Sequence, residues 1–345
     1  MALVVKILLV FYITFAKSLS IDFPSLDDAA EFAQLSLLAY IDPSFLGCDD
    51  IIASSPSIFN DDLECLYFSP ESHVIVVSSR MNNYIGISYR GSIDLEDIIA
   101  NARVRMVAFG PDPFHSTIPS NRNIQVHNGF NTAVFESYQD VLNTVTSAIK
   151  ENPDKRIVVT GHSLGAANSI LSATALATDL HNHFIESISF GSPMTGNDDW
   201  KDYVNSLQNL GIWRFVYLDD IVPRMPGPRF DGYRHPGHTF QFGEERNEVY
   251  YLHYGDEQLL YLGAPKTWQS ASFDDTRASI KMHFLGRYIK YIKRHSVRNP
   301  DIFYKQEFMQ VITKSAAIVK RHKNVRVQTT LYHRRKDHRG PHGVW

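Results

Sequence analysis

The chain has 345 residues, of which 44% are hydrophobic and 21% charged, and its net charge is −3. This composition excludes a disordered chain and is typical of a globular protein with a packed core, in one large domain or two small ones. Neither a transmembrane segment nor a nucleic-acid partner is expected, because no apolar run reaches spanning length and the chain as a whole is not basic.

Residues 1–20 have the pattern of a secretory signal peptide. Lys6 precedes the apolar run 7–16, which is too short to span a bilayer, and small residues suited to cleavage follow at Ala16, Ser18 and Ser20. We therefore expect a secreted protein, or one held in the vacuole or another lumen of the secretory pathway. The alternative is a buried N-terminal helix.

The two cysteines, Cys48 and Cys65, lie close together in the sequence. In an oxidising compartment they would pair, and the loop-entropy argument gives such a bridge about 3 kcal/mol of stabilisation. The signal-like N-terminus favours the disulfide over two unpaired thiols.

The body, residues 21–296, alternates between helical and strand patterns. Helices are predicted at 27–40, 131–150, 166–180, 198–207 and 274–295, and strands at 73–79, 84–90, 156–160, 185–190 and 213–218, with a terminal hairpin of 238–242 and 249–254. This alternation predicts an α/β fold, with a mainly parallel central sheet covered by helices on both faces.

The stretch Gly161-His162-Ser163-Leu164-Gly165 lies between a β-branched run and an Ala-rich run. Strand, tight turn and helix in that order are typical of a nucleophile elbow, in which a serine occupies strained backbone. Glycines are needed on either side of it because side chains there would collide with the neighbouring strand and helix.

A serine nucleophile needs a base, and the base needs an acid to orient it. The first acids at a predicted strand end after Ser163 are Asp219 and Asp220. Five histidines follow, and periodicity does not choose among them: His235, His238, His253, His283 and His295.

Several segments, in order, resemble those of the class 3 lipases, the secreted fungal type within the α/β-hydrolase fold. Besides the elbow, they are Tyr89-Arg90-Gly91-Ser92, Val126-His127-Asn128-Gly129-Phe130, Phe190-Gly191-Ser192-Pro193, Asp220-Ile221-Val222-Pro223 and Gly232-Tyr233-Arg234-His235. The resemblance covers residues 27–289 and implies a Ser-His-Asp ester hydrolase that needs no metal or organic cofactor.

Carried over by position, the resemblance implies that Ser163 is the nucleophile, Asp220 the acid and His283 the base. His253 is the second candidate for the base, because the residues that flank His283 match the family loosely. Ser92 and the backbone amide of Leu164 would form the oxyanion hole.

Residues 93–100 take the position of the family's lid. Apolar side chains fall on one helical face and acids on another, which suits a lid that opens at a lipid–water interface; the apolar residues are Ile93, Leu95, Ile98 and Ile99. The segment has no Trp, and Asn101 stands where an Asp is expected, so an esterase for soluble substrates stays open. An ordinary surface helix is the other alternative.

Residues 297–345 are predicted to form a basic extension, helical at first and then disordered. From Arg287 to Trp345 there are 15 Lys/Arg against 3 Asp/Glu, so contact with an anionic surface is possible. A solvated helix with a disordered end is the plainer interpretation.

The leading prediction is a secreted triacylglycerol lipase that works through an acyl-enzyme. The alternatives are a phospholipase, galactolipase or feruloyl-type esterase of the same fold, and a catalytically silent protein that binds lipid.

Overall fold

A computed structural model describes the chain in nine main segments and a few isolated residues. They are residues 24–41, 47–53, 62–92, 105–112, 121–217, 220–226, 232–242, 249–252 and 282–296, with 59, 114 and 118–119 between them. The predicted signal peptide, lid and basic extension lie outside these residues and stay predictions. Within the described part of the chain, no helix is both long and apolar enough to cross a bilayer.

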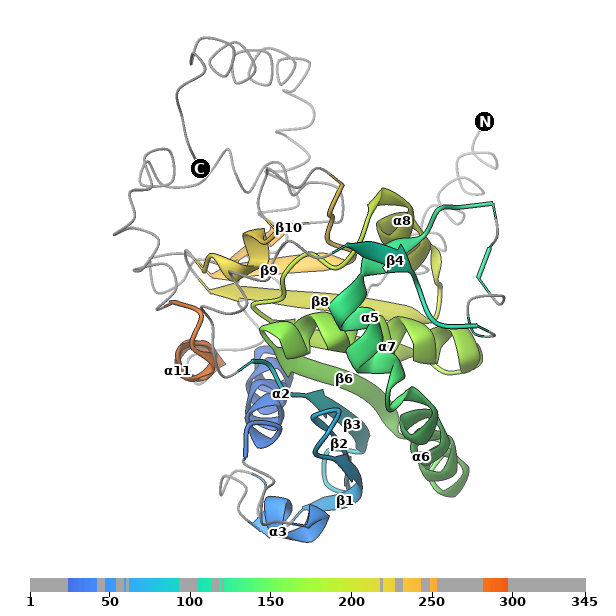
Figure 1. The fold of residues 1–345 in the computed structure, drawn as a ribbon. Helices are drawn as coiled ribbons and strands as arrows, with labels where there is room; N and C mark the ends of the chain where they lie inside the picture. The colour runs from blue at the N-terminus through green and yellow to red at the C-terminus, as the bar shows by residue number, and fades with distance from the viewer. Residues whose placement is uncertain are drawn as a thin grey trace, which may run out of the picture.

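An eight-stranded sheet forms the centre of the protein, in the order β1-β2-β3-β6-β7-β8-β9-β10 (Figure 1). The bounds are β1 Leu63–Ser69, β2 Val74–Ser79, β3 Tyr84–Tyr89, β6 Arg156–His162, β7 Ile185–Phe190, β8 Leu210–Tyr217, β9 His238–Phe242 and β10 Val249–Leu252. The strands from β3 to β9 run parallel, whereas β1–β2, β2–β3 and β9–β10 pair antiparallel. The expected mainly parallel sheet and terminal hairpin are therefore confirmed.

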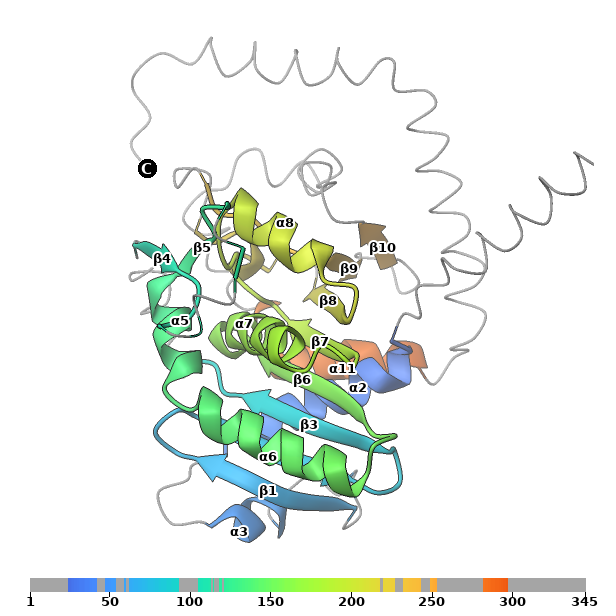
Figure 2. The same cartoon turned by 90° about the vertical axis from the view of Figure 1, so that its right-hand side faces the viewer.

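Helices cover both faces of this sheet (Figure 2). One face carries α2 (Leu26–Leu38) and α11 (Leu285–Ser296), and the other α5 (Asn128–Phe135), α6 (Tyr138–Glu151), α7 (Leu164–Asp179) and α8 (Asp198–Ser206). The core divides accordingly. On β6, Val159 packs in the cluster under α7 and Val158 in the cluster under α2, as the alternation of side chains along a strand requires.

Smaller elements lie outside these layers. Helix α3 (Cys48–Ala53) packs on β1, a 3-10 turn spans Val222–Arg224, and β4 (Met106–Ala108) pairs with β5 (Gln125–His127) in a separate two-stranded sheet. The expected disulfide between Cys48 and Cys65 is present, with 5.7 Å between the two Cα atoms, and it joins α3 to β1.

Two predicted helices differ from the observed ones. The single helix expected at 131–150 is two, α5 and α6, because the backbone at Ser137 leaves helical geometry (φ −122°, ψ 2°). This break lets Phe135 and Tyr138 both pack on the ring of Phe114.

The last helix begins at Leu285, so His283 precedes it instead of lying within it. The carbonyl of His283 accepts a hydrogen bond from the His162 side chain (2.5 Å), which takes the place of a helical partner. Residues 274–281, which the predicted helix also included, lie outside the described residues.

Candidate active site

Ser163 occupies the sharp turn between β6 and α7. Its backbone has φ 62° and ψ −127°, a conformation that strains any residue other than glycine. A β-carbon at Gly161 would lie 2.2 Å from the Gly165 carbonyl oxygen, and one at Gly165 would lie 2.1 Å from that of Tyr89. The expected strain and the need for both glycines are confirmed.

Asp220 follows β8, and three groups donate hydrogen bonds to its carboxylate. His283 Nδ1 lies 2.7 Å and the Tyr288 hydroxyl 2.5 Å from Oδ2, while the Val222 amide lies 2.9 Å from Oδ1. Because the carboxylate accepts at Nδ1, the network assigns the Nδ1–H tautomer to neutral His283 and leaves Nε2 able to take a proton. Burial and the charge of Asp220 raise the pKa of Tyr288 well above its usual value, so this phenol stays a donor.

The end of β7 brings Ser163 and this pair together. The amide of Ser163 donates to the carbonyl of Phe190 (3.0 Å), and a β-carbon on the next residue, Gly191, would lie 2.9 Å from both Asp220 Oδ2 and His283 Cε1. Ser163 Oγ and His283 Nε2 are both buried, and neither has a hydrogen-bond partner among the described residues. The Ser163 hydroxyl and the His283 Nε2 nitrogen are therefore free of other hydrogen-bond partners near the end of β7.

The positions expected to form the oxyanion hole lie at the ends of two neighbouring parallel strands. Ser92 follows β3 and is half-buried, and Leu164 follows β6 as the first residue of α7. A β-carbon at Gly91 would lie 3.0 Å from Ser163 Cβ, so the Ser92 loop passes close to the serine. The first amides of a helix have no partner within the helix and favour negative charge.

Of the other candidate residues, the structure describes the side chains of His235 and His238. His235 Nε2 donates to the Pro223 carbonyl (2.6 Å), and His238 stacks on Trp213 with the ring centroids 5.0 Å apart. The histidine that hydrogen-bonds to Asp220 is His283. The side chain of His295 is not among those described. Asp219, His253, Asn101 and the lid residues Ile93, Leu95, Ile98 and Ile99 lie outside the described residues.

Three residues of the site have no counterpart in the sequence predictions: Tyr40, His162 and Tyr288. His162 lies inside the elbow motif and Tyr288 lies five residues after His283, so proximity to the motifs was a usable signal for both. Tyr40 is 122 residues from His162, and only the fold brings them together.

The fold and the strained serine define an α/β hydrolase, and comparison with known proteins supports this class. A triacylglycerol lipase from Penicillium expansum has a similar fold (TM-score 0.54, 18% identity, covering 75% of this chain and 88% of that one). A lipase from Rhizopus microsporus var. chinensis is similar too (TM-score 0.53, 22% identity, 63% and 74%).

Residues 86–230 match the lipase (class 3) family. Secreted mono- and diacylglycerol lipase 1 of Fusarium solani is 34% identical over 160 residues, which are 46% of this chain and 44% of that protein. Phospholipase A1-IIbeta of Arabidopsis thaliana is 38% identical over 111 residues, 29% and 26% of the two chains. The chain spans about half the length of the first curated relatives it matches.

Proposed function

We propose that the protein is a secreted serine hydrolase that cleaves the ester bonds of acylglycerols. The observation that carries this proposal is the strained Ser163 with an unpartnered hydroxyl, beside a His283 whose far nitrogen is held by Asp220. A serine, a base and an orienting acid in this chain order suit acyl transfer on an α/β-hydrolase fold.

In the proposed reaction, His283 Nε2 takes the proton of Ser163 as the serine oxygen attacks the ester carbonyl. Asp220 stabilises the imidazolium, and His283 returns the proton to the departing alcohol. Water then attacks the acyl-enzyme by the same route and releases the fatty acid.

The backbone amides of Ser92 and Leu164 would hold the oxyanion. In this proposal Ser92 supplies its amide and hydroxyl and Leu164 its amide. The loss of one such donor typically costs about 3–4 kcal/mol of transition-state stabilisation.

Substitution of the serine tests this proposal directly. Ser163→Ala is expected to fold and to lose hydrolysis of p-nitrophenyl esters together with labelling by a fluorophosphonate probe. Ser169→Ala is the matched control, since Ser169 is also a buried serine, lies in α7 directly after the elbow, and donates its hydroxyl to the Ala166 carbonyl (2.8 Å). Hydrolysis by Ser163→Ala equal to that of the control would contradict the proposal.

The class of ester is tested with lipid substrates. Two curated relatives, the Fusarium solani protein and one from Malassezia restricta, are named mono- and diacylglycerol lipases. Their names support partial glycerides as the substrate of this chain, whereas the sequence prediction was a triacylglycerol. Comparison of mono-, di- and triolein emulsions with phospholipid, galactolipid and feruloyl esters ranks these substrates. Absence of fluorophosphonate labelling in the wild type would favour the silent lipid-binding protein instead.

Secretion is part of the proposal. The curated relatives are secreted proteins, the cysteines form a disulfide, and residues 1–20 have a signal-like pattern. The expected result is that the protein expressed in eukaryotic cells is recovered from the medium, whereas a chain lacking residues 1–20 stays in the cells.

A further inference from the structure

His162, which directly precedes Ser163, makes two side-chain hydrogen bonds to distant segments. Its Nδ1 lies 2.9 Å from the hydroxyl of Tyr40, and its Nε2 lies 2.5 Å from the backbone carbonyl of His283. The two partners are 122 and 121 residues away in the sequence. One imidazole therefore joins the segment after α2 to the segment that carries the proposed base.

The partners fix how this imidazole is protonated. A backbone carbonyl can only accept, so Nε2 of His162 carries the proton and Nδ1 accepts from the Tyr40 hydroxyl. Burial, followed by the neighbouring His283, lowers the pKa of His162 well below its usual value. The ring is therefore neutral under working conditions and keeps one donor and one acceptor in fixed places.

Tyr40 also contacts the loop that leads to Ser92. The backbone of Gly91 hydrogen-bonds to the Tyr40 hydroxyl, and a β-carbon at Gly91 would lie 2.2 Å from that oxygen. The same hydroxyl thus contacts the oxyanion loop on one side and His162 on the other.

Apart from the bond to His162 and the bonds of His283 and Tyr288 to Asp220, the described hydrogen bonds of the segment that carries His283 are local. In the described part of the chain, the Phe284 carbonyl accepts from the Arg287 amide (2.8 Å), and α11 begins only at Leu285. The rings of His162 and His283 lie 4.5 Å apart, so a shift of one displaces the other. The position of the base relative to Ser163 therefore depends on His162, which holds the His283 backbone, as well as on Asp220, which holds its ring.

We propose that Tyr40 and His162 are positioning residues that set the distance between the base His283, the nucleophile Ser163 and the oxyanion loop. Neither side chain hydrogen-bonds to Ser163 Oγ or to His283 Nε2. This inference rests on the proposed function, because it assigns His283 and Ser163 their roles in ester hydrolysis.

Four variants test the proposal. His162→Leu removes both hydrogen bonds, His162→Gln keeps a donor for the His283 carbonyl, and Tyr40→Phe removes only the hydroxyl. Tyr138→Phe is the matched control: its hydroxyl donates to Asp179 (2.6 Å) from α6, on the other face of the sheet.

The expected result is a loss in kcat on a soluble p-nitrophenyl ester with KM little changed. A displacement of about 1 Å at a catalytic group can cost about 100-fold, which sets the scale for His162→Leu. Tyr40→Phe, which loses the neutral hydrogen bonds of the hydroxyl to His162 and to the Gly91 backbone, is expected to lose about fivefold for each bond. His162→Gln should recover most of the loss, and Tyr138→Phe should lower the melting temperature without a change in kcat.

The outcomes separate this inference from the proposed function. If the fluorophosphonate probe fails to label Ser163 in the wild type, the proposed function is wrong and the inference falls with it. If the wild type is labelled but His162→Leu and Tyr40→Phe keep the wild-type kcat, whatever their KM, only the positioning role is wrong. Should His162→Leu not fold, Tyr40→Phe, which keeps the ring, decides the question.

Discussion

At the scale of single residues, the site is defined by positions that have no room for a β-carbon. Gly161 and Gly165 let the elbow turn, Gly91 lets the Ser92 loop approach the serine, and Gly191 lies against the acid and the base. Gly191 requires glycine for a second reason, because its backbone has a positive φ of 62°. Side-chain chemistry at this site therefore depends on neighbouring positions that have no side chain.

Two glycine-to-alanine changes, at Gly191 in the site and at Gly286 away from crowding, test whether a β-carbon at Gly191 disturbs the site. In Gly191→Ala the new methyl lies 2.9 Å from both Asp220 Oδ2 and His283 Cε1, so we expect kcat/KM to fall. The expected loss in kcat/KM is about 100-fold, because a displacement of a catalytic group by about 1 Å can cost that much.

Gly286→Ala is the control for that change. A β-carbon there meets nothing within 4 Å, and the residue lies in α11. Removing a helical glycine should stabilise the protein by about 0.5–1 kcal/mol in urea unfolding, with no loss of activity. If the two variants behaved alike, crowding at Gly191 would not matter.

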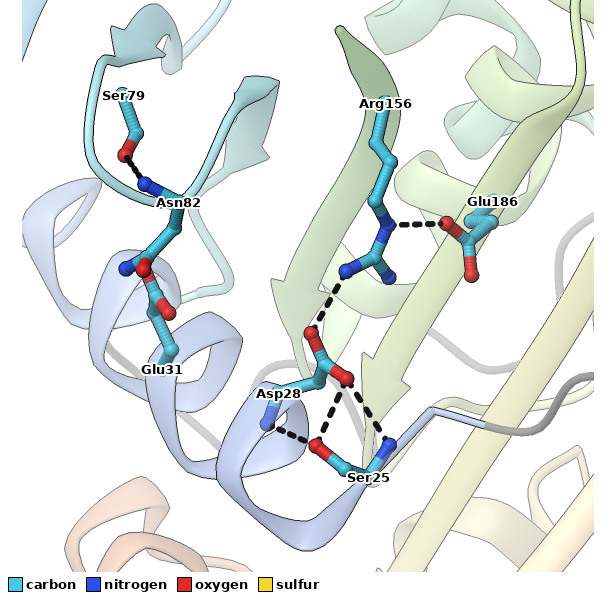
Figure 3. A network of polar contacts seen from close by, with 7 residues as sticks. All are labelled: Ser25, Asp28, Glu31, Ser79, Asn82, Arg156 and Glu186. Atoms are coloured by element: carbon cyan, nitrogen blue, oxygen red, sulfur yellow. Dashed lines mark hydrogen bonds and ion pairs between the residues drawn. The ribbon is translucent and has the colours of Figure 1, made fainter.

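At the scale of elements, α2 is held to the sheet by charge as well as by its apolar face. Arg156, at the start of β6, lies 2.8 Å from Asp28 on α2 and 3.0 Å from Glu186 on β7 (Figure 3). Asp28 also closes a capping box with Ser25 at the start of α2. The Asp28 carboxylate thus caps the start of α2 and ties it to β6, and Arg156 extends the link to β7 through Glu186.

This arrangement predicts a dependence of stability on pH. Burial alone would raise the pKa of Asp28, but the hydrogen bond and charge of Arg156 outweigh it, so the pKa is lowered from 3.8. A lowered pKa in the folded state means that stability is fully present above pH 3.8 and is lost as the pH falls below it.

Asp28→Asn removes the titration while keeping an acceptor for Ser25. We expect the melting temperature of this variant to fall less than that of the wild type between pH 6 and pH 3. These limits lie about two units above and about one unit below the usual Asp pKa. Asp27→Asn, an exposed first-turn acid of the same helix, is the control and should follow the wild type. Parallel acid curves for all three proteins would contradict the role of Asp28.

Most of the sheet could be predicted from the sequence, because parallel strands buried on both faces are continuous apolar runs. Strand β1 was missed because its side chains are mostly half-buried and include Glu64 and Cys65. The α5–α6 break was missed because Glu136 and Ser137 interrupt no apolar period. It is set by the packing of Phe135 and Tyr138 on Phe114, which no local pattern encodes.

The site divides in the same way. Ser163 could be predicted from the local strand–turn–helix pattern, whereas the strand end left both Asp219 and Asp220 open and the family resemblance chose Asp220. His283 could be chosen only through the family resemblance, because its partner lies 63 residues away. Tyr40 could not be predicted, since its contact with His162 depends on how α2 meets the end of β6.

At the scale of the whole molecule, the disulfide and the proposed site lie far apart. Cys48 and Cys65 join α3 to β1, the strand at one edge of the sheet, whereas Ser163 follows β6, the fourth strand in. Stability and catalysis should therefore separate when the bridge is removed.

The double variant Cys48→Ser/Cys65→Ser tests this separation. With the cysteines 17 positions apart in the sequence, loop entropy predicts that the free energy of unfolding falls by about 3 kcal/mol. The kcat of the folded fraction should equal that of the wild type, measured at a temperature well below its melting point. A matching loss of kcat would mean that the edge strand also supports the site.

The pairing of α2 with α11 has a consequence for biosynthesis. These are the first and last helices described, they pack side by side (Figure 1), and Lys293 bonds to Gln34 across them (2.7 Å). Tyr40 comes from the early end, and His283 and Tyr288 from the late end. A ribosome must therefore release more than 240 residues after α2 before the proposed base can reach Ser163, so on the proposed function a growing chain is expected to hydrolyse no ester until His283 has left the ribosome.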